Sequence, residues 1–401
     1  MKLRTVLFEQ LGSRLGEEQV DNRIFRQMLM ICLIVFIISA KGYIQSQDTG
    51  YSIQTAQAIA SHRQLNIQYS AGNTLIGRDG KSYSKWGTGL AFYYLPWVAA
   101  ATGLSHITRL PDYEVIGLLI SFANIPFAIF AMIYFRKLLK LLAVKRIYFW
   151  LLPLWLALGT LAWPYAVDDL SEEMQMCLLI ITVYCVVRST AKSAIAGGMS
   201  YAWLILVKLV YAAFIPLFLI YLLMQPGRLR PRIDKIALFT LPITAAFCLT
   251  AWLNFVRFGN PLESGYGGEA HQFFALQLWH TVPKLLGSLD KGLFIFCPVL
   301  ILGLLGWKGF IIRHRHEAAL CGGLLIGSLL LFGAWYGWSG GWCWGPRFLV
   351  PEIPLWLLPI AFWSTRWLTQ ARRLALVVLT LIIIALQIPG VLVVCLTQMI
   401  V

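Results

Sequence analysis

The residues with the clearest capacity for chemistry are one aspartate and a set of cations. Asp48 follows the first apolar run of the chain, residues 27–44, and stands at the head of a polar segment. A carboxylate placed there can accept a proton from a hydroxyl or amine as a general base. Cations recur where other polar segments meet apolar runs, and such side chains can hold a phosphate group, arginine with two parallel hydrogen bonds. These cations are Lys85, Lys208, Arg257 and Arg347.

A second group of acids lies in one short polar segment and comprises Asp168, Asp169 and Glu172. Asp48 together with Asp168 or Asp169 could bind a divalent cation as a cofactor, although the spacing does not require one. Simpler roles are also open, because Asp48 and the Asp168–Asp169 pair each precede an expected helix and would serve as N-caps. Lys208 differs, since a charge inside an apolar stretch is costly and predicts a function.

The composition indicates an integral membrane protein. Hydrophobic residues make up 59% of the 401 residues and charged residues only 13%, whereas soluble domains are near 45–50% and 25%. Many apolar runs approach the ~20 residues that span a bilayer as a helix. The net charge of +15 lies mostly in short loops between these runs, so it reflects membrane orientation and not nucleic-acid binding.

The distribution of Lys and Arg orients the chain. With the N-terminus in the cytoplasm and eleven spans, 22 of the 33 Lys and Arg residues fall in cytoplasmic segments, as expected for such segments. This topology predicts one transmembrane domain, 1–401, without a separate soluble domain. Its segments are a first span at 27–44, an external loop at 45–112, spans two to seven at 113–256, a second external loop at 257–291, and spans eight to eleven at 292–400.

Two helices are expected to lie along the membrane in the first external loop. Residues 49–62 have helical apolar periodicity. Residues 86–104 are apolar but cannot be a span, because a crossing there would place the five cations of 136–146 outside. The run 196–224 is too long for one span and has Lys208 near its middle, which predicts two short helices that meet there.

Six stretches in order resemble the bacterial GT-C glycosyltransferases related to protein O-mannosyltransferases and the lipid A aminoarabinose transferase (family-39-like). They include a "G-K-S-Y-S-K-W-G-T-G" run and a Gly- and Trp-rich run that ends in "G-P-R-F". The stretches are Asp48–Tyr51, Gly80–Gly89, Gly159–Tyr165, Asn254–Pro261, Asp290–Pro298 and Trp335–Phe348.

The resemblance implies an all-α polytopic GT-C fold and an inverting transferase. The donor would be a polyprenyl-phosphate sugar, and the acceptor an envelope lipid, glycan or protein at the outer face of the bacterial inner membrane. Asp48 corresponds to the catalytic base, and Asp168 or Asp169 to the second-loop acid of some members. The residues expected around the donor phosphate and cavity are Lys85, Lys208, Arg257, Arg347, Tyr83, Tyr266 and Trp338.

Two other classes stay open. A flippase or transporter for lipid-linked sugars would need charges along a path through the bilayer, whereas here they gather outside. A non-catalytic paralogue in envelope assembly would suit the absence of a paired acid, because Gln47 and Thr49 flank Asp48.

Overall fold

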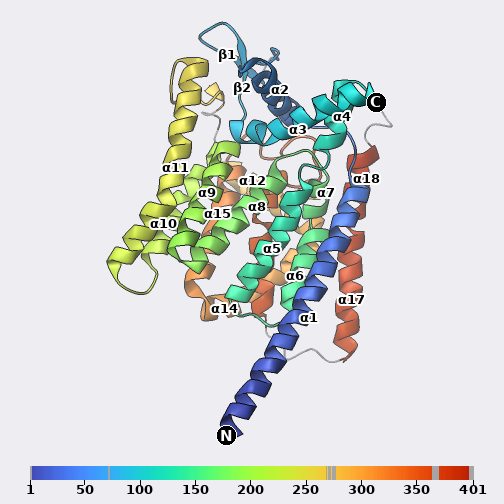
Figure 1. The fold of residues 1–401 in the computed structure, drawn as a ribbon, viewed down its shortest axis with the longest axis vertical. Coiled ribbons are helices and arrows are strands. Elements are labelled where there is room, and N and C mark those ends of the chain that lie inside the picture. Colours follow the sequence, from blue (N-terminus) through green and yellow to red (C-terminus); the bar gives the residue numbers. More distant parts are fainter. Residues whose placement is uncertain are drawn as a thin grey trace.

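Helices form most of the computed structural model, which describes residues 2–70, 73–267, 269, 272, 277–363 and 370–396. Long helices run side by side, and a smaller layer of short elements covers one end of the bundle (Figure 1). Parts of the predicted segments 257–291 and 292–400 lie outside the described residues. The prediction of an all-α polytopic membrane protein is confirmed.

Five helical stretches are long and apolar enough to cross a membrane. The other predicted spans that the structure describes consist of shorter or interrupted helices, so the number eleven remains a prediction. The five stretches are Glu18–Ser39, Asp112–Leu141, Leu229–Phe258, Arg315–Gly333 and Leu374–Val393.

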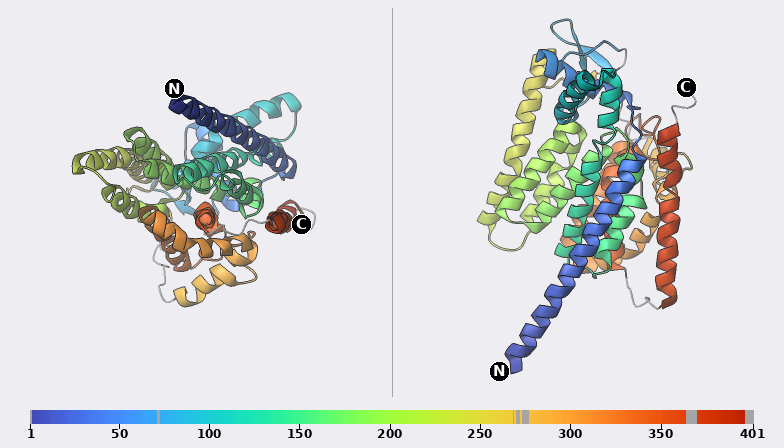
Figure 2. Two further views of the ribbon diagram at one scale, coloured as in Figure 1. Left: turned by 90° about the horizontal axis from the view of Figure 1, so that it is seen from below. Right: turned by 45° about the vertical axis from the view of Figure 1, so that its right-hand side comes forward.

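The first helix, α1 (Lys2–Ser39), is long and continues past the bundle at its N-terminal end (Figure 2). It presents Cys32 and Phe36 to the interior, where both are fully buried, while Ile34 and Ile38 on its outer side are exposed. A helix that is apolar on its outward face needs an apolar solvent there, which the hydrocarbon core of a bilayer supplies. The helix ends at Ser39, so residues 40–44 of the predicted span lie beyond it.

The centre of the bundle is α8, which is buried on nearly all sides. It packs between α5 and α9, and α9 packs in turn on α11. The helices of the first half are α4 (Asp112–Ile120), α5 (Ile125–Leu141), α6 (Tyr148–Leu158), α7 (Ala162–Ala166), α8 (Glu172–Arg188), α9 (Ala191–Val207), α10 (Ile215–Leu223) and α11 (Leu229–Phe258).

The predicted meeting of two helices at Lys208 is confirmed. Lys208 has an extended backbone between α9 and a short 3-10 helix, η1 (Leu209–Phe214). Residues 199–215, on both sides of this break, contain no Gly or Pro. The hydroxyl of Tyr201 in α9 donates to the Tyr211 carbonyl at 2.6 Å, which ties the two sides of the break together.

The covering layer contains α2 (Gln47–His62), α3 (Thr88–Thr108) and an antiparallel hairpin of β1 (Thr74–Ile76) and β2 (Ser82–Ser84), in which Leu75 pairs with Tyr83. Gly87 and Gly89 at the start of α3 lie against the backbone of Leu206 and Val207, and a Cβ on either glycine would collide with it. The glycines of this motif therefore seat the covering layer directly on the end of α9.

The second half of the chain completes the bundle with shorter pieces. Residues 348–362 are buried throughout, and the segment 347–362 alternates between 3-10 and α-helical turns. The elements are α12 (Leu278–Gly287), α13 (Leu293–Phe296), η4 (Pro298–Leu300), α14 (Ile301–Arg313), α15 (Arg315–Gly333), η5 (Arg347–Glu352), α16 (Ile353–Leu357), η6 (Leu358–Phe362), α17 (Gln370–Ala385) and α18 (Ile388–Leu396).

Candidate active site

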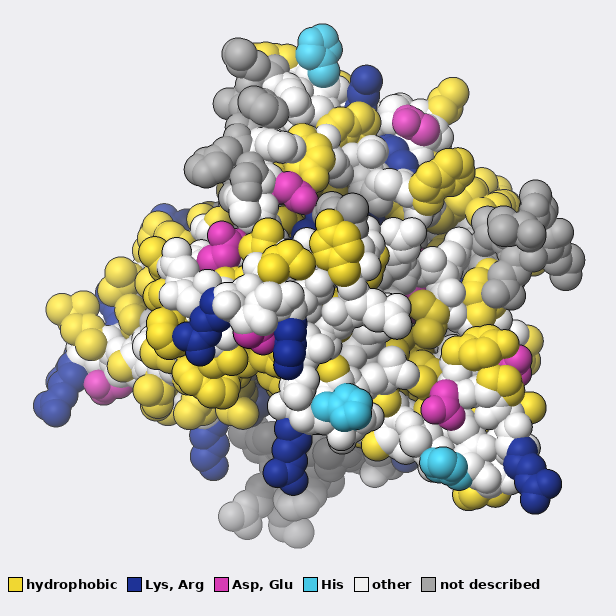
Figure 3. Space-filling view, turned by 90° about the horizontal axis from the view of Figure 1, so that it is seen from above, with side chains coloured by type: hydrophobic (Ala, Val, Ile, Leu, Met, Phe, Trp, Pro, Cys, Tyr) yellow, Lys and Arg dark blue, Asp and Glu magenta, His cyan; other side chains and the backbone are white. Residues whose placement is uncertain are grey.

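A cavity of about 530 Å³ opens between the covering layer and the bundle. Its walls come from α2, the turn before α3, the start of α8, the break at Lys208, the end of α11, the loop after it and the segment before η5. Figure 3 shows this end of the molecule, where acidic, basic and apolar side chains are all exposed. The predicted site residues that line the cavity are Asp48, Lys85, Glu172, Lys208, Arg257, Tyr266 and Arg347.

Asp48 and Arg347 are an ion pair across the cavity, although 299 positions separate them in the chain. Arg347 Nη1 donates to Asp48 Oδ2 at 3.2 Å. Asp48 is not an N-cap, because Ser46 occupies that position of α2, and the carboxylate is free to face the cavity. Among the described residues, no hydrogen bond to Asp48 Oδ1 is found, so this oxygen can receive a proton.

The Gly-rich segment before Arg347 shapes its position. Gly340 has a left-handed backbone with φ +74°, and a Cβ built on it would lie 2.7 Å from Arg347 Cγ. Gly341 has nearly the same φ, +73°, but an added Cβ would meet open space. Gly340 thus permits the loop to close over the stem of the arginine, whereas Gly341 supplies only the turn.

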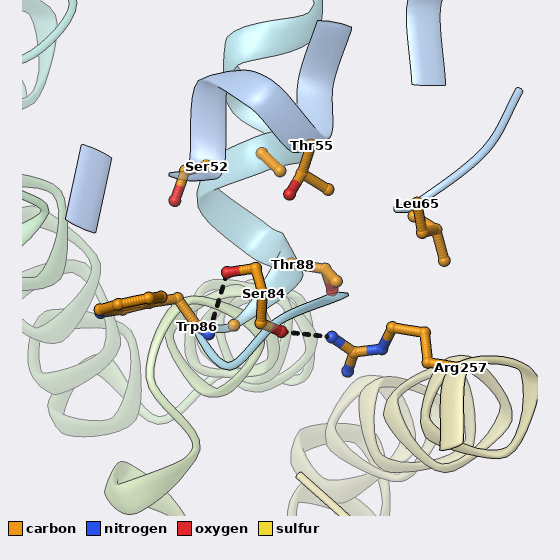
Figure 4. Close-up of a pocket in the computed structure, with 9 residues that line it drawn as sticks. Ser52, Thr55, Leu65, Ser84, Trp86, Thr88 and Arg257 are labelled. Carbon is orange, nitrogen blue, oxygen red and sulfur yellow. Dashed lines mark hydrogen bonds between the residues drawn. The ribbon is translucent and has the colours of Figure 1, made fainter. Parts of the chain in front are cut away.

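Lys85 lies at the other side of the cavity and is held by the backbone around it. Arg257 reaches from α11 and donates through Nη1 to the Ser84 carbonyl at 3.0 Å, while Ser84 Oγ accepts the Trp86 N–H at 3.2 Å (Figure 4). The Lys85 amine pairs with Glu269, at 2.9 and 3.2 Å from the two carboxylate oxygens.

The guanidinium of Arg257 is hydrogen-bonded to other groups of the protein. Besides Ser84, its guanidinium donates to the Leu253 carbonyl at 3.3 Å and to Asn254 Oδ1 at 2.6 Å. Figure 4 shows the side chain directed towards the Ser84–Trp86 turn from α11. This geometry makes Arg257 the support of the turn that presents Lys85.

Glu172 and Lys208 form a third charged pair, with Lys208 Nζ 3.7 Å from Glu172 Oε1. The amine lies 4.3 Å from the centre of the Phe348 ring and 5.3 Å from that of Phe332. A cation over aromatic faces is stabilised by their electron density. Both rings also line the cavity, so this corner combines two charges with an aromatic wall.

Asp168 and Asp169 point elsewhere. Both contact the buried amine of Lys41, at 2.7 and 2.5 Å. Asp169 Oδ2 accepts the Ser46 N–H at 2.9 Å, and its carbonyl accepts the Thr49 hydroxyl at 2.6 Å. Lys41, Asp168 and Asp169, here called the staple, therefore fix the backbone on both sides of Asp48.

The electrostatics of the staple follow from its burial. Burial and the neighbouring charge of Asp168 raise the pKa of Asp169, while Lys41 opposes the rise. Burial alone would also raise the pKa of Asp168, but the charge of Lys41 lowers it. The two acids therefore share one cation unequally, which limits the net charge of a water-free site.

The part of the chain that the structure describes does not bring a metal-binding group together. Among the described residues, no cluster of three or more Asp, Glu, His or Cys side chains is placed to hold a metal ion. The carboxylates of Asp168 and Asp169 are engaged with Lys41 and do not line the cavity with Asp48. These residues do not fit a divalent cation shared with Asp48.

Three aromatic predictions have different outcomes. Tyr266 lines the cavity, where burial and the charges of Asp48 and Glu269 raise its pKa to about 12. Tyr83 is not among the described residues of the cavity wall, because the strand turns its hydroxyl to Asp79 at 2.8 Å. Trp338 likewise packs against the core beside Lys284.

The sequence reasoning missed Lys41 and Glu269, which pair with predicted residues. Trp335, the first residue of the Gly- and Trp-rich stretch Trp335–Phe348, lines the cavity in T-shaped contact with Tyr266 at 6.4 Å. A lysine near the end of the first apolar run, residues 27–44, was the signal available for Lys41. Nothing local marked Glu269, since its partner lies 184 positions away.

The fold matches solved membrane glycosyltransferases. The crystal structure of ArnT from Cupriavidus metallidurans bound to undecaprenyl phosphate aligns with 89% of this chain at a TM-score of 0.54 and 14% identity, and 62% of that chain is covered. The crystal structure of the same ArnT in the apo state gives a TM-score of 0.54 and 13% identity, with 88% of this chain and 61% of that chain covered. The cryo-EM structure of arabinofuranosyltransferase AftD from Mycobacteria gives a TM-score of 0.52 and 14% identity, with 92% of this chain and 27% of that chain covered.

These likenesses confirm the predicted GT-C fold. The chain spans 62% of the length of the ligand-bound ArnT chain and a smaller share of AftD. No protein-family model and no curated protein sequence matches the chain.

Proposed function

We propose that this protein is a membrane glycosyltransferase that transfers a sugar from a polyprenyl-phosphate donor to an envelope lipid, glycan or protein. The observation that carries the proposal is the cavity, which has a carboxylate, Asp48, and a lysine, Lys85, on its walls within a GT-C fold. A donor of this class contains one phosphate beside the reacting carbon, and an acceptor hydroxyl must lose a proton as it attacks. The cavity offers a group for each requirement.

The reaction is a single displacement. Asp48 removes the proton from the acceptor hydroxyl, whose oxygen attacks the anomeric carbon of the donor sugar. The bond from that carbon to the phosphate oxygen breaks, and the electron pair leaves with the polyprenyl phosphate. Because attack and departure occur on opposite faces, the configuration at the anomeric carbon inverts.

The charged residues divide this work. Arg347 holds one oxygen of Asp48 and leaves the other for the incoming proton. Lys85 stabilises the charge that develops on the leaving phosphate, an interaction that is stronger in a cavity with little water. Arg257 supports Lys85 through the Ser84 carbonyl. Phosphate binding at Lys85 requires the carboxylate of Glu269 to give way.

The Lys and Arg distribution supports a cavity on the external face of the membrane, and the family resemblance supports the bacterial inner membrane. Cysteine scanning tests this orientation. A cysteine at Gly80, in a turn with open space around it, should react with a membrane-impermeant thiol reagent added outside cells. One at Leu141, at the opposite end of the bundle, should not, and external labelling there would contradict the proposed orientation.

The decisive experiment is transfer of radiolabelled sugar by the purified protein from polyprenyl-phosphate donors to an envelope-lipid extract. Asp48→Asn keeps the size and the hydrogen-bonding oxygen but cannot take a proton, so we expect at least a ~100-fold lower rate. Its thermal stability should stay close to that of the wild type, because the pair with Arg347 is partly exposed. Transfer at the normal rate by Asp48→Asn would assign the base elsewhere.

The same assay addresses the two other classes. A flippase would move the labelled lipid across a vesicle membrane without forming a transfer product, and a non-catalytic paralogue would bind donor without either outcome. Either pattern in the wild-type protein would refute the proposed activity.

A further inference from the structure

Two buried polar atoms on the cavity wall have no hydrogen-bond partner among the described residues. One is the acceptor Glu172 Oε2 and the other is the donor Arg347 Nε. Glu172 is 2% exposed, and both residues line the cavity. Unpaired buried polar atoms are rare in native structures because each costs desolvation energy without a compensating bond. A pair of them on one cavity wall indicates that a ligand supplies the missing partners.

The described contacts of Glu172 and Arg347 are made by other atoms of the two side chains. The other oxygen of Glu172 faces Lys208 at 3.7 Å, and Arg347 Nη1 is engaged with Asp48. The charge of Glu172 acts on Arg347, yet no ion pair within 4.0 Å joins the two among the described contacts. Glu172 Oε2 and Arg347 Nε are therefore a buried acceptor and a buried donor without described partners, on residues that line the same cavity.

A hydroxyl group fits this arrangement, because it donates one hydrogen bond and accepts others. It can donate to Glu172 Oε2 while accepting from Arg347 Nε. The parallel rings of Phe332 and Phe348, 5.2 Å apart, stand beside the same corner. Their faces suit the C–H face of a sugar ring. The corner thus has the polar and apolar components of a saccharide subsite.

An ammonium group fits less well. It would pair with Glu172, but Lys208 already lies 3.7 Å from that carboxylate and Arg347 lies nearby. A third cation there would be repelled by two others in a poorly hydrated site. The charge pattern favours a neutral hydroxyl over an amine.

We propose that Glu172 and Arg347 form a sugar-recognition subsite that binds a ring hydroxyl of a neutral donor sugar. This inference rests on the proposed function, since it assigns the donor sugar of that reaction. It makes Glu172 a specificity-determining residue and gives Arg347 a second task beside holding Asp48. Lys208 lies 3.7 Å from the other oxygen of Glu172 and holds that carboxylate in place.

The test measures binding and does not depend on turnover. Full-length protein in lipid nanodiscs is titrated with polyprenyl phosphate alone and with polyprenyl phosphates of several neutral sugars and one amino sugar. In the wild type, at least one neutral sugar lipid should bind more tightly than the bare phosphate. Glu172→Ala should remove about 10–100-fold of that affinity, as expected for a hydrogen bond to a charged group, and should not weaken binding of bare polyprenyl phosphate.

Two further variants serve as controls. Glu173→Gln alters the neighbouring acid, which is also buried with unpaired oxygens but does not line the cavity, and should keep the wild-type preference for the sugar lipid. Glu172→Gln retains an acceptor oxygen and should recover part of the preference. It also provides a second variant if Glu172→Ala does not fold.

Several results would overturn the subsite. They are an unchanged sugar preference in Glu172→Ala, tighter binding of the amino sugar than of every neutral sugar, or no sugar lipid bound more tightly than bare polyprenyl phosphate. The last would mean that water alone fills the gap. Transfer activity in the radiolabel assay reports separately on the proposed function, so an active enzyme with an unchanged preference in Glu172→Ala refutes only the subsite.

Discussion

Replacing Lys41 with methionine tests whether the staple is structural. The Lys41 side chain is fully buried, as is that of Asp169, and the side chain of Asp168 is 10% exposed. Methionine fills a similar volume but leaves two carboxylates in a water-free site without their cation. Removing one partner of a buried ion pair typically costs about 3–5 kcal/mol. We expect the free energy of unfolding to fall by about that amount.

The assay is equilibrium or thermal unfolding of the purified protein in detergent, with Lys140→Met as the matched control. Lys140 also pairs with an acid, Glu18 at 3.4 Å, but its side chain is 32% exposed and that of Glu18 is 61% exposed. Exposed pairs contribute about 0–1 kcal/mol. A Lys41→Met protein as stable as Lys140→Met would refute the calculation.

The triple variant Lys41→Met/Asp168→Asn/Asp169→Asn separates structure from chemistry. It removes all three charges together, and replacing a whole buried ion set is often close to neutral. The asparagine at 169 can still accept the Ser46 N–H that fixes the start of α2. We expect most of the lost stability to return, together with transfer activity. A stable triple variant without activity would show that Asp168 or Asp169 takes part in the chemistry.

Three further predictions concern the cavity. Gly340→Ala should lower kcat/KM at least tenfold because its Cβ would displace the arginine stem, whereas Gly341→Ala, with the same left-handed backbone and open space, should lower it much less. Lys208→Met should weaken binding of the sugar-linked donor while circular dichroism shows unchanged helix content; equal affinity would assign Lys208 to structure alone. Glu269→Gln should tighten binding of bare polyprenyl phosphate about 1.4–5-fold, because it releases Lys85 from a partly exposed ion pair that contributes ~0.2–1 kcal/mol. Weaker binding in this variant would mean that Glu269 positions Lys85.

Local signals were sufficient for much of the fold. Apolar runs and the Lys and Arg distribution predicted a polytopic helical bundle with membrane-parallel helices, and α2 and α3 occupy the expected stretches. Helix lengths were harder to predict, because the break at Lys208 lies within residues 199–215, which contain no Gly or Pro. The break depends on a hydrogen bond from Tyr201 to the carbonyl of Tyr211 and on the backbone of Gly87 against α9. Such tertiary causes leave no periodicity in the sequence.

The same contrast between local sequence signals and tertiary contacts applies to the site. Residue type and position indicated Asp48, Lys85, Glu172 and Arg347, all of which line one cavity. Their partners could not be read locally, because each ion pair joins distant segments: Asp48 with Arg347 across 299 positions and Lys85 with Glu269 across 184. Tyr83 was misplaced because alternation along β2 turns its side chain to Asp79.

Hydrogen-bond saturation distinguishes acids that burial alone would group together. Asp169 and Glu172 lie three positions apart and are both nearly inaccessible, at 1% and 2% exposure. Both carboxylate oxygens of Asp169 accept bonds from the protein, from Lys41 and from the backbone N–H of Ser46. Glu172 keeps one oxygen without a partner on the cavity wall. The saturated acid has nothing left to offer a ligand and therefore holds the backbone, whereas the unsaturated acid on the cavity wall retains an oxygen that can accept a hydrogen bond.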